Sequence, residues 1–444
     1  MIFEILRREG YGVGSRDFYT KIDEWKDWHK GKVGSFHTYM QYNGVKRLSR
    51  ERASLCMAKK VCEEWANLLM NEKVEGTTQN DGFDAILKDV LTKNNFRVRS
   101  NQLIELTFAL GTGAFVENRI GGNINIDYIT ADMIFPLSYD NGEIYDCAFA
   151  SEIKKRGEDY RYIQYHLRQG NGSYIIKNKF YSAKDGKEVF GIFGNVAEIV
   201  QSKVPLFQII TPNIINNYDF SNPMGISVFA NAIDVLKGID LIYDSYQNEF
   251  RLGKKRIIVP MGMAQIMNTQ DGTMPIFDDN DTEFYAIKET DDFTQLKEIN
   301  MEIRSEAHLG ALKNSLDVLS SLTGLGNDRF SFDTYKNGIK TATEVISEKS
   351  ELFQNLKKHE LILSAALKKL YRAVLCLSDK DADERNIKID FDDSIIQDKE
   401  KEFAQDLQLV SSGIMQKWEF RVKHFNESER EAKKMCAEDE FAEE

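Results

Sequence analysis

The sequence predicts an α+β fold that is mainly helical. Apolar residues recur at the helical period on both sides of a central stretch, 114–210, in which apolar and polar residues alternate. Only 6 of the 444 residues are proline, which permits long uninterrupted helices. Hydrophobic residues make up 42% of the chain, so it can bury a large core and wholesale disorder is excluded.

Three helices are expected before the central stretch. In 49–73 the apolar residues repeat every three or four positions, which is one face of an amphipathic helix. A second helix is expected over 83–93 and a third over 100–110. The third is followed by Gly111-Thr112-Gly113, a glycine signal typical of a helix C-terminus.

The central stretch is expected to be an antiparallel β region. Residues 123–128 alternate between apolar and polar, the period of a half-buried strand. The segments 160–167 and 172–181 flank a Gly-Asn-Gly turn signal at 170–172, so they are expected to pair as neighbouring strands.

A long helix is expected from residue 225 to 252, and it carries a coiled-coil type seam. This seam could close against another helix of the same chain or of a neighbouring chain. Its residues are Phe229, Ala232, Leu236, Ile239, Tyr243, Tyr246 and Phe250, spaced alternately by three and four.

The remaining elements follow in a distinctive order. A non-helical insert, 257–292, has strand-like ends and an acidic cluster at 278–281, and a helix is expected to resume over 293–322. A glycine-containing loop at 324–333 follows. Residues 341–377 contain neither Pro nor Gly, which predicts a helix of roughly 55 Å at 1.5 Å per residue.

The segment after residue 378 is strongly acidic. It holds 20 acidic and 11 basic side chains, and so carries most of the net charge of −12. Helical patterns recur in it around Phe403 and in 427–435, and the last residues are expected to fray. The acidic balance disfavours a conventional basic DNA-binding domain, although a few local cations could still contact nucleic acid.

Several other classes of protein are disfavoured by what the sequence lacks. It has no run of about 18 apolar residues and no signal peptide, so a cytosolic chain without a membrane span is expected. The 5 cysteines do not follow the spacing of a zinc site. No phosphate-binding loop, GxSxG elbow or HExxH pair is present.

Three features have two interpretations each, a functional role and an ordinary structural one. Asp390, Asp392 and Asp393 could bind a divalent metal as in a nuclease, although a solvated acidic turn is the ordinary reading. His359 lies on an apolar helix stripe, which favours a core or interface position over catalysis. The loop 327–340 mixes aromatic and basic residues, which suits contact with a nucleic-acid backbone as well as an ordinary surface loop.

The order of elements from residue 225 onward resembles the portal proteins of tailed bacteriophages, in particular those of siphophages and prophages of Gram-positive bacteria. Each motif by itself is degenerate, but together the motifs occur in the same order as in that family, over nearly the whole chain. The similar stretches are 227–234 and 240–250 for the helix entering the stem, 320–326, 330–333 and 341–345 around the tunnel loop, 402–415 and 419–421 near the C-terminus, and Trp28, 42–44 and the helix through Trp65 near the N-terminus.

The resemblance implies the portal fold, with a wing of helices and antiparallel β-structure, stem helices, a small clip, a tunnel loop and a long helix into an α-helical crown. The implied parts are the wing at 1–224, stem helix 1 at 225–255, the clip at 256–292, stem helix 2 continuing into the wing at 293–324, the tunnel loop at 325–340, the long helix at 341–378, and the crown with its acidic tail at 379–444.

The resemblance also implies functional residues in three groups. The tunnel loop that meets DNA is expected to use Asn327, Arg329, Phe330, Phe332, Tyr335, Lys336 and Lys340. The clip, which docks the terminase and later the adaptor, is expected to use Asp271, Asp278, Asp279, Asp281 and Phe284. Packing of the stem helix is expected to involve Phe229, Leu236, Ile239, Tyr243, Tyr246 and Phe250.

The implied function is structural and not enzymatic, with no cofactor, no metal and no membrane. The chain would form a homo-oligomeric ring, a 12-mer by analogy, at one capsid vertex of a virion assembled in the host cytoplasm. Double-stranded DNA would be packaged through the ring by terminase and later ejected. Capsid and scaffolding proteins, the terminase large subunit and the head–tail adaptor would be its partners. The alternatives are another head–tail or minor capsid component, or a metal-dependent nuclease.

Overall fold

The computed structural model describes residues 2–12, 14, 16–42, 45–71, 74–191, 196–253, 256–260, 266–269, 272–275, 284–287, 297–327, 329–330, 342–391, 399–425 and 432–436. The chain divides into two compact units. One comprises Met1–Glu72 with Gly76–Ile389, and the other comprises Lys73–Glu75 with Asp390–Glu444.

The helices of the N-terminal third pack around a central helix, α6. The short α1 (Ile2–Arg8) contacts β6 through the edge-on rings of Phe3 and Phe135, 5.5 Å apart. The other helices are α2 (Arg16–His29), α3 (Gly34–His37), α4 (Met57–Leu69), α5 (Asp81–Lys93) and α6 (Phe96–Leu110). As expected from the sequence, α6 ends at Gly111 in the left-handed conformation, where a Cβ atom would lie 2.4 Å from the carbonyl oxygen of Gly225.

The helix expected over 49–73 begins later than predicted, at Met57. The start was wrong because residues 47–51 form a strand, β2 (Arg47–Glu51), which pairs antiparallel with β1 (Thr38–Tyr42). The backbone hydrogen bonds to β1 hold residues 47–51 in a strand, so the helix that the apolar spacing predicts forms only after the hairpin.

The central antiparallel β region is confirmed, and it consists of two sheets. The first has the order β11-β4-β5, and the second has the order β10-β9-β8-β7-β6. Their inner side chains meet, as shown by the rings of Phe149 and Phe207, whose centroids are 5.4 Å apart. The strands are β4 (Gly113–Ile120), β5 (Asn123–Thr130), β6 (Ile134–Asp140), β7 (Glu143–Lys155), β8 (Glu158–Arg168), β9 (Tyr174–Ser182), β10 (Ile199–Ser202) and β11 (Phe207–Ile210).

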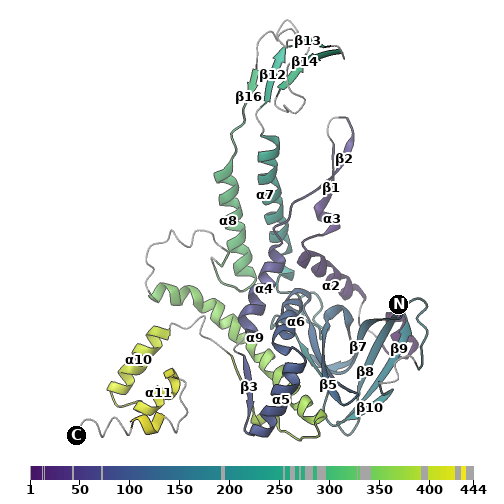
Figure 1. Cartoon of the computed structure of the whole chain (residues 1–444), viewed down its shortest axis with the longest axis vertical. Coiled ribbons are helices and arrows are strands. Elements are labelled where there is room, and N and C mark those ends of the chain that lie inside the picture. The colour runs from purple at the N-terminus through teal and green to yellow at the C-terminus, as the bar shows by residue number, and fades with distance from the viewer. Residues whose placement is uncertain are drawn as a thin grey trace. The chain divides into compact units, whose positions relative to one another are not determined.

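Two helices run side by side away from this body, with a small group of strands at their far end (Figure 1). They are α7 (Ile233–Leu252) and α8 (Ser305–Leu322). The expected start of the first of these helices, at residue 225, was wrong, because the backbone N–H of Val228 donates to the carbonyl of Phe108 and α7 begins only at Ile233. The strands are β12 (Arg256–Pro260), β13 (Ile266–Thr269), β14 (Gly272–Pro275), β15 (Phe284–Ile287) and β16 (Lys297–Ile299). The expected start of the returning helix, at 293, was wrong, since Lys297–Ile299 pairs with β12 as a strand and α8 begins at Ser305.

The long uninterrupted helix is confirmed as α9 (Ala342–Leu377), which has 36 residues. Its C-terminal half packs on β4, β11 and α5, where Leu363, Leu367 and Leu370 are buried. After α9, β17 (Ile387–Asp390) pairs with β3 (Glu75–Thr78).

The second unit contains α10 (Lys399–Ser411) and α11 (Lys417–Phe425). The ring centroids of Phe403 and Phe420 lie 5.0 Å apart between the two helices. Asp406 joins them electrostatically, with its Oδ2 atom 2.6 Å from Lys423 Nζ and 2.8 Å from His424 Nε2. The unit therefore has a small core of its own.

Candidate functional site

The seam predicted on α7 is buried at its base and becomes exposed toward the far end of the helix. Phe229, just before the helix, and Leu236 and Ile239 are buried, whereas Phe250 is 48% exposed. The middle of the seam faces α8, because the ring of Tyr246 lies 5.7 Å from that of His308. The seam thus packs in part against the returning helix of the same chain.

An ion pair joins the far ends of α7 and α8. Arg304 donates from Nε to Oε1 of Glu249 at 3.2 Å, and His308 Nε2 lies 3.7 Å from the same oxygen. The hydrogen bond from Arg304 lowers the pKa of Glu249. A hollow of about 600 Å³ beside this pair is lined by residues of both chain segments, including Asn248 and Met301. It lies where the helix pair gives way to the group of strands.

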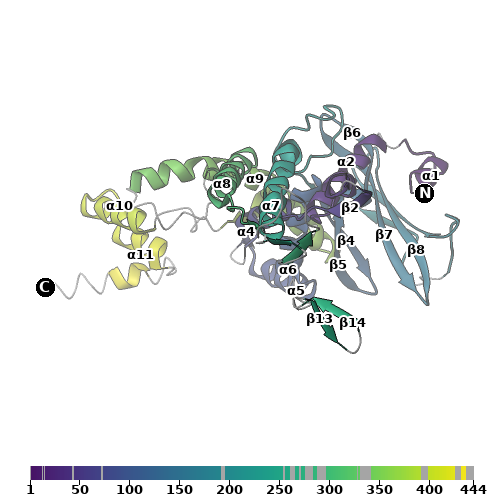
Figure 2. The ribbon, with the colours of Figure 1, turned by 90° about the horizontal axis from the view of Figure 1, so that it is seen from above.

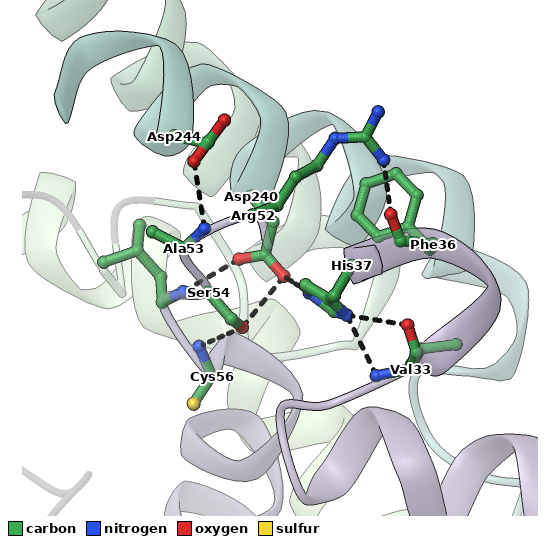
Figure 3. A network of polar contacts seen from close by, with 10 residues as sticks. Val33, Phe36, His37, Arg52, Ala53, Ser54, Cys56, Asp240 and Asp244 are labelled. Atoms are coloured by element: carbon green, nitrogen blue, oxygen red, sulfur yellow. Dashed lines mark hydrogen bonds and ion pairs between the residues drawn. The ribbon is translucent and has the colours of Figure 1, made fainter. Parts of the chain in front are cut away.

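A buried polar network fixes the base of α7 to the N-terminal part of the chain (Figure 3). Asp240 accepts three hydrogen bonds, from His37 Nε2 at 3.0 Å, from the Ser54 hydroxyl at 2.9 Å and from the backbone N–H of Leu55 at 2.8 Å. The side chains of His37 and Asp240 are only 4% and 5% exposed. The carboxylate is therefore held by donors that compensate for its removal from water.

Both ring nitrogens of His37 have polar partners. Nδ1 lies 2.9 Å from the backbone nitrogen of Val33 and 3.2 Å from its carbonyl oxygen, while Nε2 faces the Asp240 carboxylate, which can only accept a hydrogen bond. One turn further along α7, Asp244 accepts the backbone N–H of Ala53 at 3.0 Å (Figure 3). Both ends of the β1–β2 hairpin are thus bonded to α7.

No pattern in the sequence indicates this network. His37 and Asp240 are 203 positions apart, and neither belongs to a recognisable motif. A lone histidine and a mid-helix aspartate are individually unremarkable, so only the fold reveals that they meet.

The segment leading into the predicted tunnel loop is anchored at its root. The indole N–H of Trp65 donates to the carbonyl of Thr323 at 3.0 Å, and the Asn355 side chain donates to the carbonyl of Gly324 at 3.0 Å. Gly324 has a φ of +77°, which favours glycine. Helices α4 and α9 therefore hold the backbone where α8 ends.

Arg329, one of the predicted DNA-contacting residues, forms an ion pair with α4. Its guanidinium donates from Nε to Glu64 Oε2 at 3.2 Å, and Lys60 Nζ lies 2.7 Å from the other oxygen of that carboxylate. Burial alone would raise the pKa of Glu64, but the bonds from Lys60 and Arg329 outweigh it and lower that pKa. Asn327 is exposed and Phe330 is half-buried.

The other predicted loop and clip residues are not placed together by the structure. Phe332, Tyr335, Lys336 and Lys340 lie outside the described residues, and so do Asp271, Asp278, Asp279 and Asp281. The backbone of Phe284 belongs to β15, where it pairs with Ile257 of β12.

His359 is a core histidine, in agreement with its place on the apolar stripe. Its ring lies 4.7 Å from Trp65 and 5.0 Å from Phe108, and Nδ1 accepts the backbone N–H of Asn213 at 3.0 Å. Burial lowers its pKa to about 3, so the ring is neutral at physiological pH. It supports the root of the loop by packing on Trp65.

Two further buried groups in the sheets are also neutral near pH 7. Burial raises the pKa of Glu117 to about 8, although Gln208 donates to its Oε2 atom at 3.1 Å. Burial lowers the pKa of His166 to about 3, and its ring lies 5.3 Å from both Phe149 and Phe207. Both side chains sit within the β region and belong to the core.

The possible metal site is not formed by the residues that the structure describes. Asp390 ends β17, whereas Asp392 and Asp393 lie outside the described residues. In the described ranges, no group of three or more His, Cys, Asp or Glu side chains is arranged to hold a metal ion. Within the same ranges, every helix is too short or too polar to span a bilayer.

Comparison with solved structures finds distant similarities, among them two chains of gene transfer agent particles. A chain of the virion of a native gene transfer agent particle is 12% identical, with a TM-score of 0.43 over 93% of this chain and 94% of that chain. A chain of the neck of an empty gene transfer agent particle is 13% identical, with a TM-score of 0.42 over 95% and 97%. No curated protein matches the sequence.

Comparison with protein families is decisive. The family of phage portal proteins of the SPP1 Gp6-like type matches residues 14–444, almost the entire chain. Portal proteins are structural components of the head–tail region of the virion and not enzymes, which removes the nuclease hypothesis. The chain therefore belongs to the family of SPP1 Gp6-like phage portal proteins.

Proposed function

We propose that the chain forms a ring-shaped channel at one vertex of a phage capsid, through which double-stranded DNA is packaged and later ejected. The observation that carries this proposal is the family match over residues 14–444, since the portal family implies an oligomeric ring in the virion neck. With twelve subunits of 51.0 kDa the ring would have a mass of roughly 600 kDa. The resemblance favours a siphophage or prophage of a Gram-positive host.

The proposed parts follow the arrangement of the elements. The pair α7 and α8 serves as the stem, and β12 to β16 serve as the clip (Figure 1). The two sheets and the helices around α6 form the wing at 1–224, α9 leads toward the crown, and the tail at 379–444 completes it. The assignment of stem and clip is supported by the projecting helix pair α7 and α8, which carries the strands β12 to β16 at its far end.

The segment 325–340 is proposed as the tunnel loop that meets DNA. Arg329, Lys336 and Lys340 supply cations on a chain whose net charge is −12. The acidic balance of the chain is proposed to repel the phosphate backbone, while a few loop cations give transient contact, so DNA can slide without being gripped. The root formed by Trp65 and Asn355 supports this role, because a contact loop on a fixed base keeps its position in the channel.

The clip is proposed to dock the terminase large subunit during packaging and the head–tail adaptor afterwards. The acidic cluster at 278–281, in the sequence between α7 and α8, is the reason for this assignment. Capsid and scaffolding proteins are proposed to contact the wing when the ring is built into the capsid in the host cytoplasm.

The experiment that tests the proposal is mass photometry of the purified full-length chain, followed by negative-stain imaging. We expect closed rings of roughly 600 kDa with a central channel and a narrow stem. Assemblies without a channel would favour another head–tail or minor capsid component. A chain that stays monomeric in every condition, including with capsid partners, would contradict the proposal.

A further inference from the structure

The β1–β2 hairpin is weakly supported by the rest of the first unit. Its strands pair with each other in a two-stranded sheet, and such a hairpin is at best marginally stable in water by itself. It nevertheless leaves the body at a fixed point, because the residues at both of its ends are bonded to α7 through Asp240 and Asp244. The two ends of the hairpin are thus fixed while its strands are exposed, which is typical of an element that packs against another protein chain.

One face of the hairpin combines apolar and cationic side chains. In the observed register Met40 lies opposite Ser49 and Tyr42 lies opposite Arg47, so these four residues share a face, here called the outer face. Met40 is 61% exposed and Tyr42 is 65% exposed. The Arg47 side chain is also exposed, and none of the described acidic side chains forms an ion pair with it.

The first turns of α8 present complementary chemistry. Leu309 is 55% exposed, and Glu306 lies one helical turn before it, on the same side of the helix. Glu306 is exposed, and within the described ranges no basic side chain pairs with it. An apolar contact with Met40 and an ion pair with Arg47 would both suit this surface.

The hairpin and α8 lie on opposite sides of α7. In the side view and in the view from above, α8, α7 and the hairpin follow one another in a row (Figures 1 and 2). In the side view the hairpin rises to the level at which α8 begins. The two surfaces therefore cannot meet within one chain, but a rotation about an axis parallel to the helix pair keeps them at the same level.

We propose that the outer face of the hairpin docks on the first turns of α8 in the neighbouring copy of the chain. This inference rests on the ring that we propose, because a ring is built from head-to-tail contacts in which two different surfaces of each subunit meet. The hairpin is then one surface and α8 is the other. Arg47 pairs with Glu306 of the next copy, and Met40 contacts its Leu309.

Disulfide cross-linking tests the proximity directly. The full-length chain is used with the three incompletely buried cysteines, Cys56, Cys376 and Cys436, changed to Ser. Met40→Cys and Leu309→Cys are then added, and the assembled rings are mildly oxidised. We expect a ladder from dimer to closed ring on a non-reducing gel for the double variant, and no ladder for either single variant.

A matched control pair combines Met40→Cys with Lys187→Cys, whose side chain is 80% exposed in a turn of the β region. This pair should give no ladder. Intact rings without a ladder in the Met40→Cys and Leu309→Cys variant would overturn the docking alone. If the unmodified chain forms no ring at all, the failure lies instead with the proposed function.

A charge exchange provides a second measurement if the cysteine variants do not assemble. Arg47→Glu should raise the concentration at which half of the chains are in rings by about two- to five-fold, the effect of one exposed ion pair. Glu306→Arg should do the same, and the two changes together should restore assembly. Lack of rescue in the combined variant would contradict the proposed pairing.

Discussion

The imidazole Nε2 atom of His37 lies 3.0 Å from Oδ2 of Asp240, although 203 positions separate the two residues. His37 immediately precedes the β1–β2 hairpin, and Asp240 lies in the second turn of α7. The bond therefore connects the first half of α7 to a part of the chain formed from a distant segment. Its position makes the network around Asp240 the first target for mutation.

Asp240→Asn should destabilise the folded chain by about 3 kcal/mol. The carboxylate of Asp240 receives only donors, namely His37 Nε2–H, the Ser54 hydroxyl and the Leu55 N–H. An asparagine amide would turn an NH₂ group toward one of them and leave a buried donor without an acceptor. The change can be measured by urea unfolding followed by circular dichroism.

The matched control is Asp234→Asn, in the first turn of the same helix. The Asp234 side chain is 94% exposed and contacts Lys237, so its loss should change the free energy of unfolding by no more than about 0.5 kcal/mol. Equal effects of the two substitutions would show that the buried network does not stabilise the base of α7.

Glu117→Gln should become progressively more stabilising, relative to the parent chain, as the pH rises from 4.5 to about 8. The pKa of Glu117 is raised from its usual value of 4.5 to about 8 by burial. Between these two values the unfolded chain loses the proton and the folded chain keeps it. The parent chain therefore loses roughly 1.4 kcal/mol of stability per pH unit, whereas the glutamine variant does not.

The measurement is chemical unfolding of both proteins at pH 4, 6 and 8. At pH 4 the carboxyl is largely protonated in the folded and unfolded states, so this point provides the internal reference. A constant difference between the two proteins over this range would mean that the Glu117 carboxylate is solvated in the folded chain.

His166→Phe should reduce the acid sensitivity of the fold. The pKa of His166 is lowered from 6.5 to about 3 by burial. As the pH falls below 6.5 the unfolded chain binds a proton that the folded chain excludes, which costs roughly 1.4 kcal/mol of stability per pH unit until the pH approaches 3. Phenylalanine cannot bind this proton.

The quantity to compare is the pH slope of the unfolding free energy between pH 7 and pH 4. A packing cost of the larger ring between Phe149 and Phe207 is the same at every pH and cancels in the slope. His359 remains in both proteins and contributes equally. Parallel profiles would rule out a buried neutral imidazole at position 166.

Deletion of residues 327–338 should leave ring formation intact and reduce DNA packaging. The bonds that anchor the root, from Trp65 to Thr323 and from Asn355 to Gly324, lie outside the deleted segment. Ring formation can be measured by mass photometry, and packaging by the DNA content of assembled capsids. Loss of rings would instead give this loop a structural role.

Most of the secondary structure could be predicted because it depends on local patterns. The 36 residues of α9 contain no helix breaker, and Gly111 ends α6 in the conformation that the sequence indicates. Two of the boundary errors have a common cause. Residues 47–51 and 297–299 became strands because partners elsewhere in the chain, β1 and β12, supply their hydrogen bonds.

The candidate site was less accessible from sequence, because its contacts join distant segments. His37 with Asp240 and Glu64 with Arg329 are pairs whose members carry no motif. Local periodicity locates each residue on its helix or loop, but a pairing across 203 or 265 positions depends on the complete fold. Family resemblance supplied the functional class, which these individual contacts would not have indicated.

The ladder between β12 and β16 ties together the ends of α7 and α8. Arg256 lies opposite Ile299 and Ile258 lies opposite Lys297, directly beyond the two helices. Since these backbone bonds join the chain leaving α7 to the chain entering α8, sliding of one helix past the other is limited by the short connections between the helices and the ladder. A force that pushes on the β12–β16 ladder is therefore shared by α7 and α8, so the two helices resist compression along their axes together.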